Sequence, residues 1–143
     1  MNKQGPILLI DDDNDDLEIF KEIFVELNCL NPIITFTSAD ATLSYLNENG
    51  SVNPFLIISD INLPKLSGIE LRNKIHNNEQ MRLRCIPYLF FTTSIAQQDV
   101  IDAYSKSIQG FFIKPNDLKE LKAMLQSIIT YWTFCKAPNY LRN

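Results

Sequence analysis

The sequence predicts one α/β domain built on a doubly wound parallel sheet. Three observations lead to this fold class. Short runs that are apolar throughout, at residues 6–10, 55–59 and 87–92, are typical of strands covered on both faces. Stretches with apolar residues at helical spacing separate these runs, and such alternation predicts helices on both sides of a parallel sheet. The length of 143 residues is about that of one domain, and the chain has no internal repeat or low-complexity linker.

The first part of the chain contains three expected strands and two expected helices. "PILLI" at 6–10 is expected to be a strand buried on both faces. A helix is expected over 17–27, where apolar residues recur after several acids. "IITF" at 33–36 is β-branched and aromatic, which favours a second strand. A weaker helical pattern covers 39–48, and "FLIIS" at 55–59 is a third strand.

The second part of the chain continues the alternation after a loop marked by Pro and Gly, "NLPKLSG". A helix is expected over 69–78, followed by the apolar strand "PYLFFT" at 87–92. A short helix at 97–105 precedes the last strand, "GFFI" at 110–113. The longest helical stripe runs over 118–132. The total is five strands and five helices.

Composition excludes several classes of function. The net charge of −4 gives no basic face for nucleic acid or for anionic lipid. No apolar run approaches the ~20 residues of a membrane span, and no signal-peptide segment follows the N-terminus, so we expect a cytoplasmic protein. The three scattered cysteines, Cys29, Cys85 and Cys135, have no metal-ligand spacing, and we expect reduced, buried or half-buried thiols.

Polar side chains follow four of the predicted strands, where an open parallel sheet binds its ligands. They are Asp11 and Asp12 after the first strand, Asp60 after the third, Thr92 and Thr93 at the end of the fourth, and Lys114 with Pro115 after the fifth. Neighbouring carboxylates repel one another, and a hard divalent cation removes this conflict. Mg²⁺ prefers carboxylate, phosphate and water oxygens.

These residue types suit phosphoryl transfer to a carboxylate. A carboxylate can act as the nucleophile at phosphorus and form an aspartyl-phosphate. Catalysis of this transfer is mostly positioning and charge neutralisation. Asp60 as acceptor, Mg²⁺, the Lys114 ammonium and the Thr92 hydroxyl would supply both.

Four motifs, "ILLIDDD", "SDINLPKLSG", "FFTTS" and "FFIKP", resemble the receiver domains of bacterial two-component response regulators. The resemblance spans residues 6 to about 133. It implies a flavodoxin-like (βα)5 sheet with strand order 2-1-3-4-5. We therefore expect a receiver domain over 5–134, a tail over 135–143 and no output domain.

The resemblance also implies roles for the residues at the strand ends. Asp60 would be the phosphoacceptor and Lys114 would pair with the phosphoryl oxygens. Mg²⁺, for which Mn²⁺ can substitute, would be bound directly by Asp12, through water by Asp11, and by Asp60 itself. The backbone carbonyl of Asn62 would complete the protein ligands.

Three further expectations concern the switch and the last loop. Thr92 is the expected switch hydroxyl, and Phe111 is the aromatic that rotates in the family. Because Phe lacks a hydroxyl to hold an outward state, we expect Phe111 mostly inward, with simple core packing as the alternative. The Lys114–Pro115 bond is expected to be cis.

The remaining acids of "DDDNDD" have a simpler interpretation. Asp13 is the less favoured metal ligand and is expected to face solvent. Asp15 and Asp16 are expected to do no more than charge the start of a helix, since acids in a first turn are ordinary.

The leading interpretation is a single-domain response regulator. A sensor histidine kinase or a histidine phosphotransfer protein would phosphorylate it, and it would act on a downstream protein without being an enzyme for any metabolite. A homodimer is possible, with Tyr131 and Phe134 open between core and interface roles. One alternative is a degenerate receiver that binds partners without phosphorylation. A weaker one is a haloacid-dehalogenase-like phosphatase, which wants an Asp where Asn62 stands.

Overall fold

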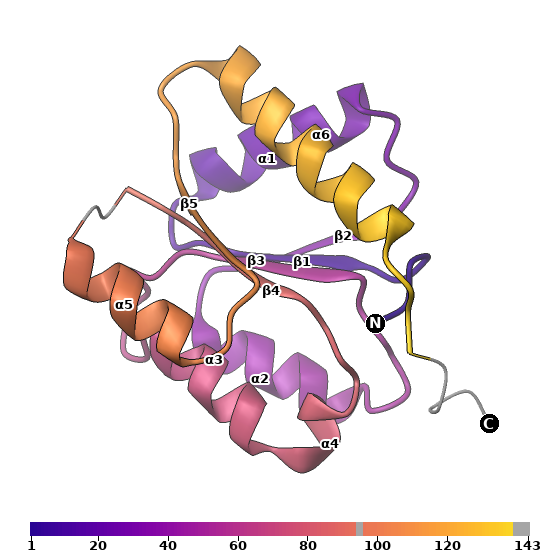
Figure 1. Ribbon diagram of the computed structural model, residues 1–143, viewed down its shortest axis with the longest axis vertical. Coiled ribbons are helices and arrows are strands. Elements are labelled where there is room, and N and C mark those ends of the chain that lie inside the picture. The colour runs from indigo at the N-terminus through magenta and orange to yellow at the C-terminus, as the bar shows by residue number, and fades with distance from the viewer. Residues whose placement is uncertain (94–95, 139–143) are drawn as a thin grey trace.

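A computed structural model describes residues 1–93 and 96–138. Five parallel strands form one sheet in the order β2-β1-β3-β4-β5, which confirms the expected topology (Figure 1). The strands are β1 (Ile7–Ile10), β2 (Ile33–Phe36), β3 (Leu56–Ser59), β4 (Tyr88–Thr92) and β5 (Gly110–Ile113).

Helices cover both faces of this sheet. They are α1 (Asn14–Glu26), α2 (Ala39–Glu48), α3 (Gly68–Asn77), α4 (Glu79–Arg82), α5 (Gln97–Ser105) and α6 (Leu118–Phe134). Figure 1 shows α1 and α6 on one face and α2, α3, α4 and α5 on the other. The short helix α4 was not expected from the sequence.

The sheet separates two apolar layers because its central strands are covered on both sides. Every residue of β1, β3 and β4 is buried, whereas β2 at one edge is half-buried. One layer packs α1 and α6 against the sheet and includes Phe20, Phe24 and Leu125. The other packs α2, α3 and α5 and includes Leu46 and Leu71. The uniformly apolar strands of the sequence follow from this arrangement.

The helix starts are fixed by side-chain caps close to the strand ends. Asp13 caps α1, its side chain accepting a hydrogen bond from the backbone N–H of Asp15 (2.9 Å). Ser67 caps α3 in the same way through the N–H of Glu70 (3.1 Å). Asp13 follows the end of β1 directly in the next loop, and Ser67 closes the longer loop after β3, so both helices start from the carboxyl-end side of the sheet.

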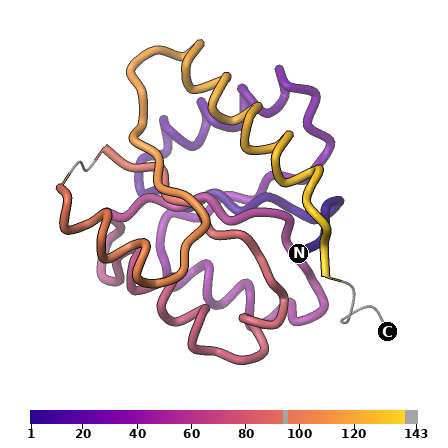
Figure 2. The backbone as a smooth tube through the Cα atoms, in the orientation of Figure 1, coloured from indigo at the N-terminus to yellow at the C-terminus, as the bar shows by residue number. Residues whose placement is uncertain are grey.

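The N-terminal segment passes beside the end of α6 (Figure 2). The Lys3 ammonium donates to the backbone carbonyl of Thr133 (2.7 Å), and the Met1 amino group donates to the carbonyl of Arg84. At this end of α6, Tyr131 and Phe134 are exposed. No helix among the described residues is long and apolar enough to cross a membrane.

Two expectations about the chain are wrong. Cys85 is exposed rather than buried, at a turn where its φ is positive, while Cys29 and Cys135 are half-buried as expected. The Lys114–Pro115 bond is trans, since no cis peptide occurs in residues 1–93 and 96–138. The trans form is the favoured isomer of an X–Pro bond, and Lys114 reaches its partners with the bond in this form.

Candidate functional site

Two carboxylates meet at the carboxyl ends of neighbouring strands. β1 and β3 pair in register, with Ile10 opposite Ser59. The next residues, Asp11 and Asp60, therefore stand side by side, and the Asp60 backbone N–H donates to the carbonyl of Ile10 (2.9 Å). Both residues are buried. Burial of two carboxylates is costly unless a cation or donors offset their charge.

Lys114 supplies that cation from the end of β5. Its Nζ lies 2.5 Å from Asp11 Oδ2 and 3.0 Å from Asp60 Oδ2. The Lys114 side chain is 11% exposed, and those of Asp11 and Asp60 are 9% and 8% exposed. The backbone N–H of Lys114 donates to the carbonyl of Thr92 (2.9 Å), which ties this loop to β4. The cation is thus held at the sheet edge by the strands themselves.

Asp16, from the first turn of α1, is a third partner of this ammonium. The distance from Lys114 Nζ to Asp16 Oδ2 is 2.9 Å, and the Asp16 side chain is 33% exposed. This contact was not expected from the sequence, in which Asp16 was interpreted as a charge at a helix start. A signal was available: Asp16 stands four residues before the buried Phe20, which places both on the inner face of the helix.

The second oxygen of each buried carboxylate accepts a hydrogen bond from the backbone of the loop that follows it. Asp11 Oδ1 accepts from the backbone N–H of Asp13 (3.0 Å), and Asp60 Oδ1 accepts from that of Asn62 (3.0 Å). Each carboxylate therefore has one oxygen on backbone and one on Lys114. These hydrogen bonds fix the orientation of both groups.

Electrostatics in this cluster reflect an excess of negative charge. Burial raises the pKa of Asp11 above its ordinary value, although the Lys114 ammonium and the Asp13 amide act in the opposite direction. Burial alone would lower the pKa of Lys114, but hydrogen bonds to Asp11, Asp16 and Asp60 outweigh it and raise that pKa. Lys114 is therefore a permanent cation, and it faces three carboxylates.

The backbone of Asp60 is packed against Gly68 at the start of α3. A Cβ at Gly68 would lie 2.1 Å from the Asp60 carbonyl oxygen and 2.9 Å from Phe90 Cε1. The Gly68 N–H donates to the Ile61 carbonyl (2.8 Å), and the Gly68 carbonyl accepts from the buried Tyr88 hydroxyl (3.2 Å). Glycine is required at this position because no side chain fits between α3 and the loop after β3.

The other predicted residues are arranged around this cluster. Thr92 is fully buried at the end of β4, and Thr93 is exposed. Phe111 is half-buried, with its ring centroid 6.1 Å from that of Phe90. Ser94, the last residue of the motif "FFTTS", lies outside the described residues. Rotation of Phe111 stays a prediction.

The donor set fits Mg²⁺ in kind. Asp11 and Asp60 present hard carboxylate oxygens at one point, and Asp12 and Asn62 beside them are exposed. The described part of the chain gathers no group of three or more His, Cys, Asp or Glu side chains in metal-binding geometry. Mg²⁺ commonly takes one or two protein carboxylates and keeps several waters, so a small set of this type suffices.

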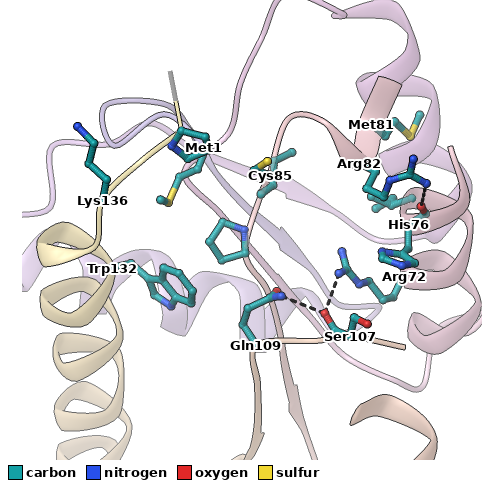
Figure 3. A pocket seen from close by; sticks show the side chains of 14 residues that line it. Met1, Arg72, His76, Met81, Arg82, Cys85, Ser107, Gln109, Trp132 and Lys136 are labelled. Atoms are coloured by element: carbon teal, nitrogen blue, oxygen red, sulfur yellow. Dashed lines mark hydrogen bonds between the residues drawn. The ribbon is translucent and has the colours of Figure 1, made fainter. Parts of the chain in front are cut away.

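A second hollow lies at the opposite end of the strands, with a volume of about 350 Å³ (Figure 3). Arg72 in its wall donates to the carbonyls of Lys106 (3.1 Å) and Ser107 (2.8 Å), and Gln109 also donates to Ser107 (2.9 Å). The Arg72 and Gln109 side chains therefore form their hydrogen bonds with backbone carbonyls of the protein itself. The hollow contains none of the carboxylates described above.

A family model described as the response regulator receiver domain matches residues 7–126. The chain belongs to the response regulator receiver family. Accepting a phosphoryl group is the general role of this family, whose members are signalling proteins of two-component systems rather than classical enzymes.

Individual relatives agree with this assignment. Response regulator Rcp1 of Synechocystis sp. is 32% identical over 135 residues, 92% of this chain and 90% of that protein. A protein named "Probable methanogenesis regulatory protein FilR2", of Methanothrix harundinacea, is 33% identical over 129 residues, 88% of this chain and 82% of that protein.

Solved structures show the same fold. The crystal structure of the phosphorylated cyanobacterial phytochrome response regulator RcpA has a TM-score of 0.85 at 23% identity, covering 94% of this receiver and 99% of that chain. The Mn²⁺-bound form of Rcp1 has a TM-score of 0.80 at 29% identity, with the same coverage.

Proposed function

We propose that this receiver is a phosphoryl-accepting signalling switch with Asp60 as the acceptor. The observation that carries the proposal is the contact of one ammonium, Lys114 Nζ, with the carboxylates of both Asp60 (3.0 Å) and Asp11 (2.5 Å) at one edge of the sheet. Such a cation neutralises charge where an incoming phosphoryl group would add more.

The proposed step is in-line transfer from a phosphohistidine. An Asp60 carboxylate oxygen attacks phosphorus and forms the new P–O bond. The P–N bond of the donor breaks, its electron pair stays on the imidazole nitrogen, and the departing imidazole can take up a proton. Lys114 donates to the phosphoryl oxygens as they arrive. The donor would be a sensor histidine kinase or a histidine phosphotransfer protein in the cytoplasm.

A divalent cation, Mg²⁺ with Mn²⁺ as a substitute, would be held by Asp11, Asp12, Asp60 and the backbone carbonyl of Asn62. When bound, it would neutralise charge on the phosphoryl oxygens. The buried carboxylates and the exposed Asp12 support this ligand set. The existence of a Mn²⁺-bound form of the similar protein Rcp1 supports it as well.

The output would be a change at a protein-binding face. Thr92 would move its hydroxyl toward the phosphoryl group and Phe111 would turn into the space left behind. Phe111 lies on β5, which packs against α5, and Thr92 ends the neighbouring strand β4. Exposed Tyr104 and Ile113 supply apolar surface there for a downstream protein or a second copy. The receiver would occupy residues 5–134, followed by a tail over 135–143.

The test is phosphorylation of the full chain by acetyl phosphate with Mg²⁺, followed by intact mass. Wild type should gain one phosphoryl group, and Asp60→Asn should gain none. Absence of the adduct in wild type would favour a degenerate receiver. Steady release of phosphate from added phosphomonoesters would favour a phosphatase instead.

A further inference from the structure

We propose that Asp16 is a positioning residue for phosphoryl transfer, acting through Lys114. This inference rests on the proposed function of Asp60. Asp16 Oδ2 lies 2.9 Å from Lys114 Nζ, as close as the acceptor Oδ2 of Asp60 at 3.0 Å. Yet Asp16 comes from a helix rather than from a strand end.

The structure distinguishes Asp16 from its neighbour Asp15. Both acids belong to the first turn of α1, and Asp13 caps that turn. Asp15 is exposed and makes no ion pair with any described residue, whereas Asp16 is two-thirds buried against Lys114. Asp16 also lines a small crevice together with Asp60, Leu17 and other residues of the sheet edge. Two adjacent carboxylates therefore have the same charge but different contacts.

The number of donors on Lys114 explains why a third carboxylate matters. An ammonium has three N–H donors, and here three carboxylates occupy them. When Asp60 accepts a phosphoryl group, the bonded oxygen loses its negative charge. Asp11 is a proposed metal ligand. Asp16 is neither the phosphoryl acceptor nor a metal ligand. It is therefore the partner that still holds Lys114 while the other N–H groups of the ammonium turn to phosphoryl oxygens.

Rigid attachment supports this role. The Lys114 side chain has four rotatable bonds and is otherwise held by the groups that change during the reaction. The Asp16 backbone lies in a helix whose inner face is packed through Leu17 and Phe20. A charged anchor on such an element fixes the position of the ammonium more tightly than the loop after β5 alone. Misplacement of such a group by about 1 Å can cost up to about 100-fold in rate.

The experiment compares Asp16→Asn with Asp15→Asn in the full chain. Each substitution removes one negative charge from the same helical turn. The difference between the two phosphorylation rates therefore reports the Asp16–Lys114 contact rather than the general electrostatic effect of losing one charge. The rate of phosphorylation by acetyl phosphate is measured at saturating Mg²⁺ by intact mass. Asp16→Asn should be about tenfold slower than Asp15→Asn, within the range for misplaced groups, and Asp16→Glu should recover most of the rate.

A double-mutant cycle separates positioning from folding. In a Lys114→Ala background the Asp16→Asn substitution should leave the rate unchanged, because its partner is gone. The same four proteins are unfolded in urea without divalent metal, which reports the Asp16–Lys114 coupling independently of phosphorylation.

Each remaining outcome has one meaning. Equal rates for Asp16→Asn and Asp15→Asn, with wild type phosphorylated, would overturn the role of Asp16 and leave the proposed function intact. A tenfold loss that persists in the Lys114→Ala background would assign Asp16 a role that does not pass through Lys114. No phosphorylation of wild type would overturn both proposals.

Discussion

Replacement of Lys114 by methionine should destabilise the metal-free receiver strongly, because two buried carboxylates lose the cation that contacts both of them. Methionine keeps an unbranched stem of similar length and removes the charge. Asp11 and Asp60 are 9% and 8% exposed, so they count as buried partners. Removing one partner of a buried ion pair typically costs about 3–5 kcal/mol.

The expected loss lies near the lower end of that range. Asp16 is 33% exposed and water can compensate its charge, so its contact adds about 0–1 kcal/mol. One of the buried carboxylates can also take up a proton, which limits the penalty. We expect about 3 kcal/mol, or a fall in Tm of roughly 6–12 °C for a chain of this size.

The assay is urea unfolding in EDTA, followed by fluorescence of the half-buried Trp132 and checked by circular dichroism. The matched control is Lys122→Met, whose ion pair with Glu26 spans 3.2 Å between side chains that are 44% and 58% exposed. This control should lose less than about 0.5 kcal/mol. Mg²⁺ at about 100 times its Kd stabilises its binding state by about 2.7 kcal/mol and should restore most of the loss in Lys114→Met. A loss below about 1 kcal/mol, or one that Mg²⁺ leaves unchanged, would refute the reasoning.

Three further predictions concern the residues around the cluster. Because the folded state raises the pKa of Asp11, ionisation of this group lowers stability as the pH rises above 3.8 in the absence of metal. Asp11→Asn should therefore gain stability relative to wild type from pH 3.8 toward neutral in urea titrations, and a flat difference would contradict this. Gly68→Ala should lose about 1–3 kcal/mol and slow phosphorylation, since its Cβ would meet the carbonyl of Asp60. Gly50→Ala, whose Cβ would have no neighbour closer than 3.9 Å, should leave both the unfolding midpoint and the phosphorylation rate unchanged. Tyr88→Phe should cost about 1 kcal/mol through the lost hydrogen bond to the Gly68 carbonyl, with thermal unfolding as the measurement.

Topology and hydrophobic pattern were sufficient to predict most of the fold. The uniformly apolar strands predicted a sheet buried on both faces, and parallel pairing then placed Asp11 beside Asp60. The short helix Glu79–Arg82 was missed because four residues are too few to show a helical period. Asn78 ends α3 with its backbone N–H and caps α4 with its side chain, a double role that no sequence pattern indicates.

The parts of the site that sequence could not supply depend on side-chain reach. Lys114 was expected to serve the phosphoryl group, but its contact with Asp16 joins residues 98 positions apart. First-turn acids are common, so composition alone did not separate Asp16 from Asp15; the four-residue spacing from Asp16 to Phe20 indicated the helix face of Asp16 but not its partner. The trans Lys114–Pro115 bond likewise differs from what the family resemblance implied.

Identification of the residue that carries the phosphoryl group tests the central claim most directly. The full chain is treated with acetyl phosphate and Mg²⁺, reduced with borohydride to convert an acyl phosphate into a stable alcohol, digested and sequenced by mass spectrometry. We predict the reduced residue at position 60, and no such product when Mg²⁺ is replaced by EDTA. A modified residue elsewhere, or equal modification without a divalent metal, would contradict the claim.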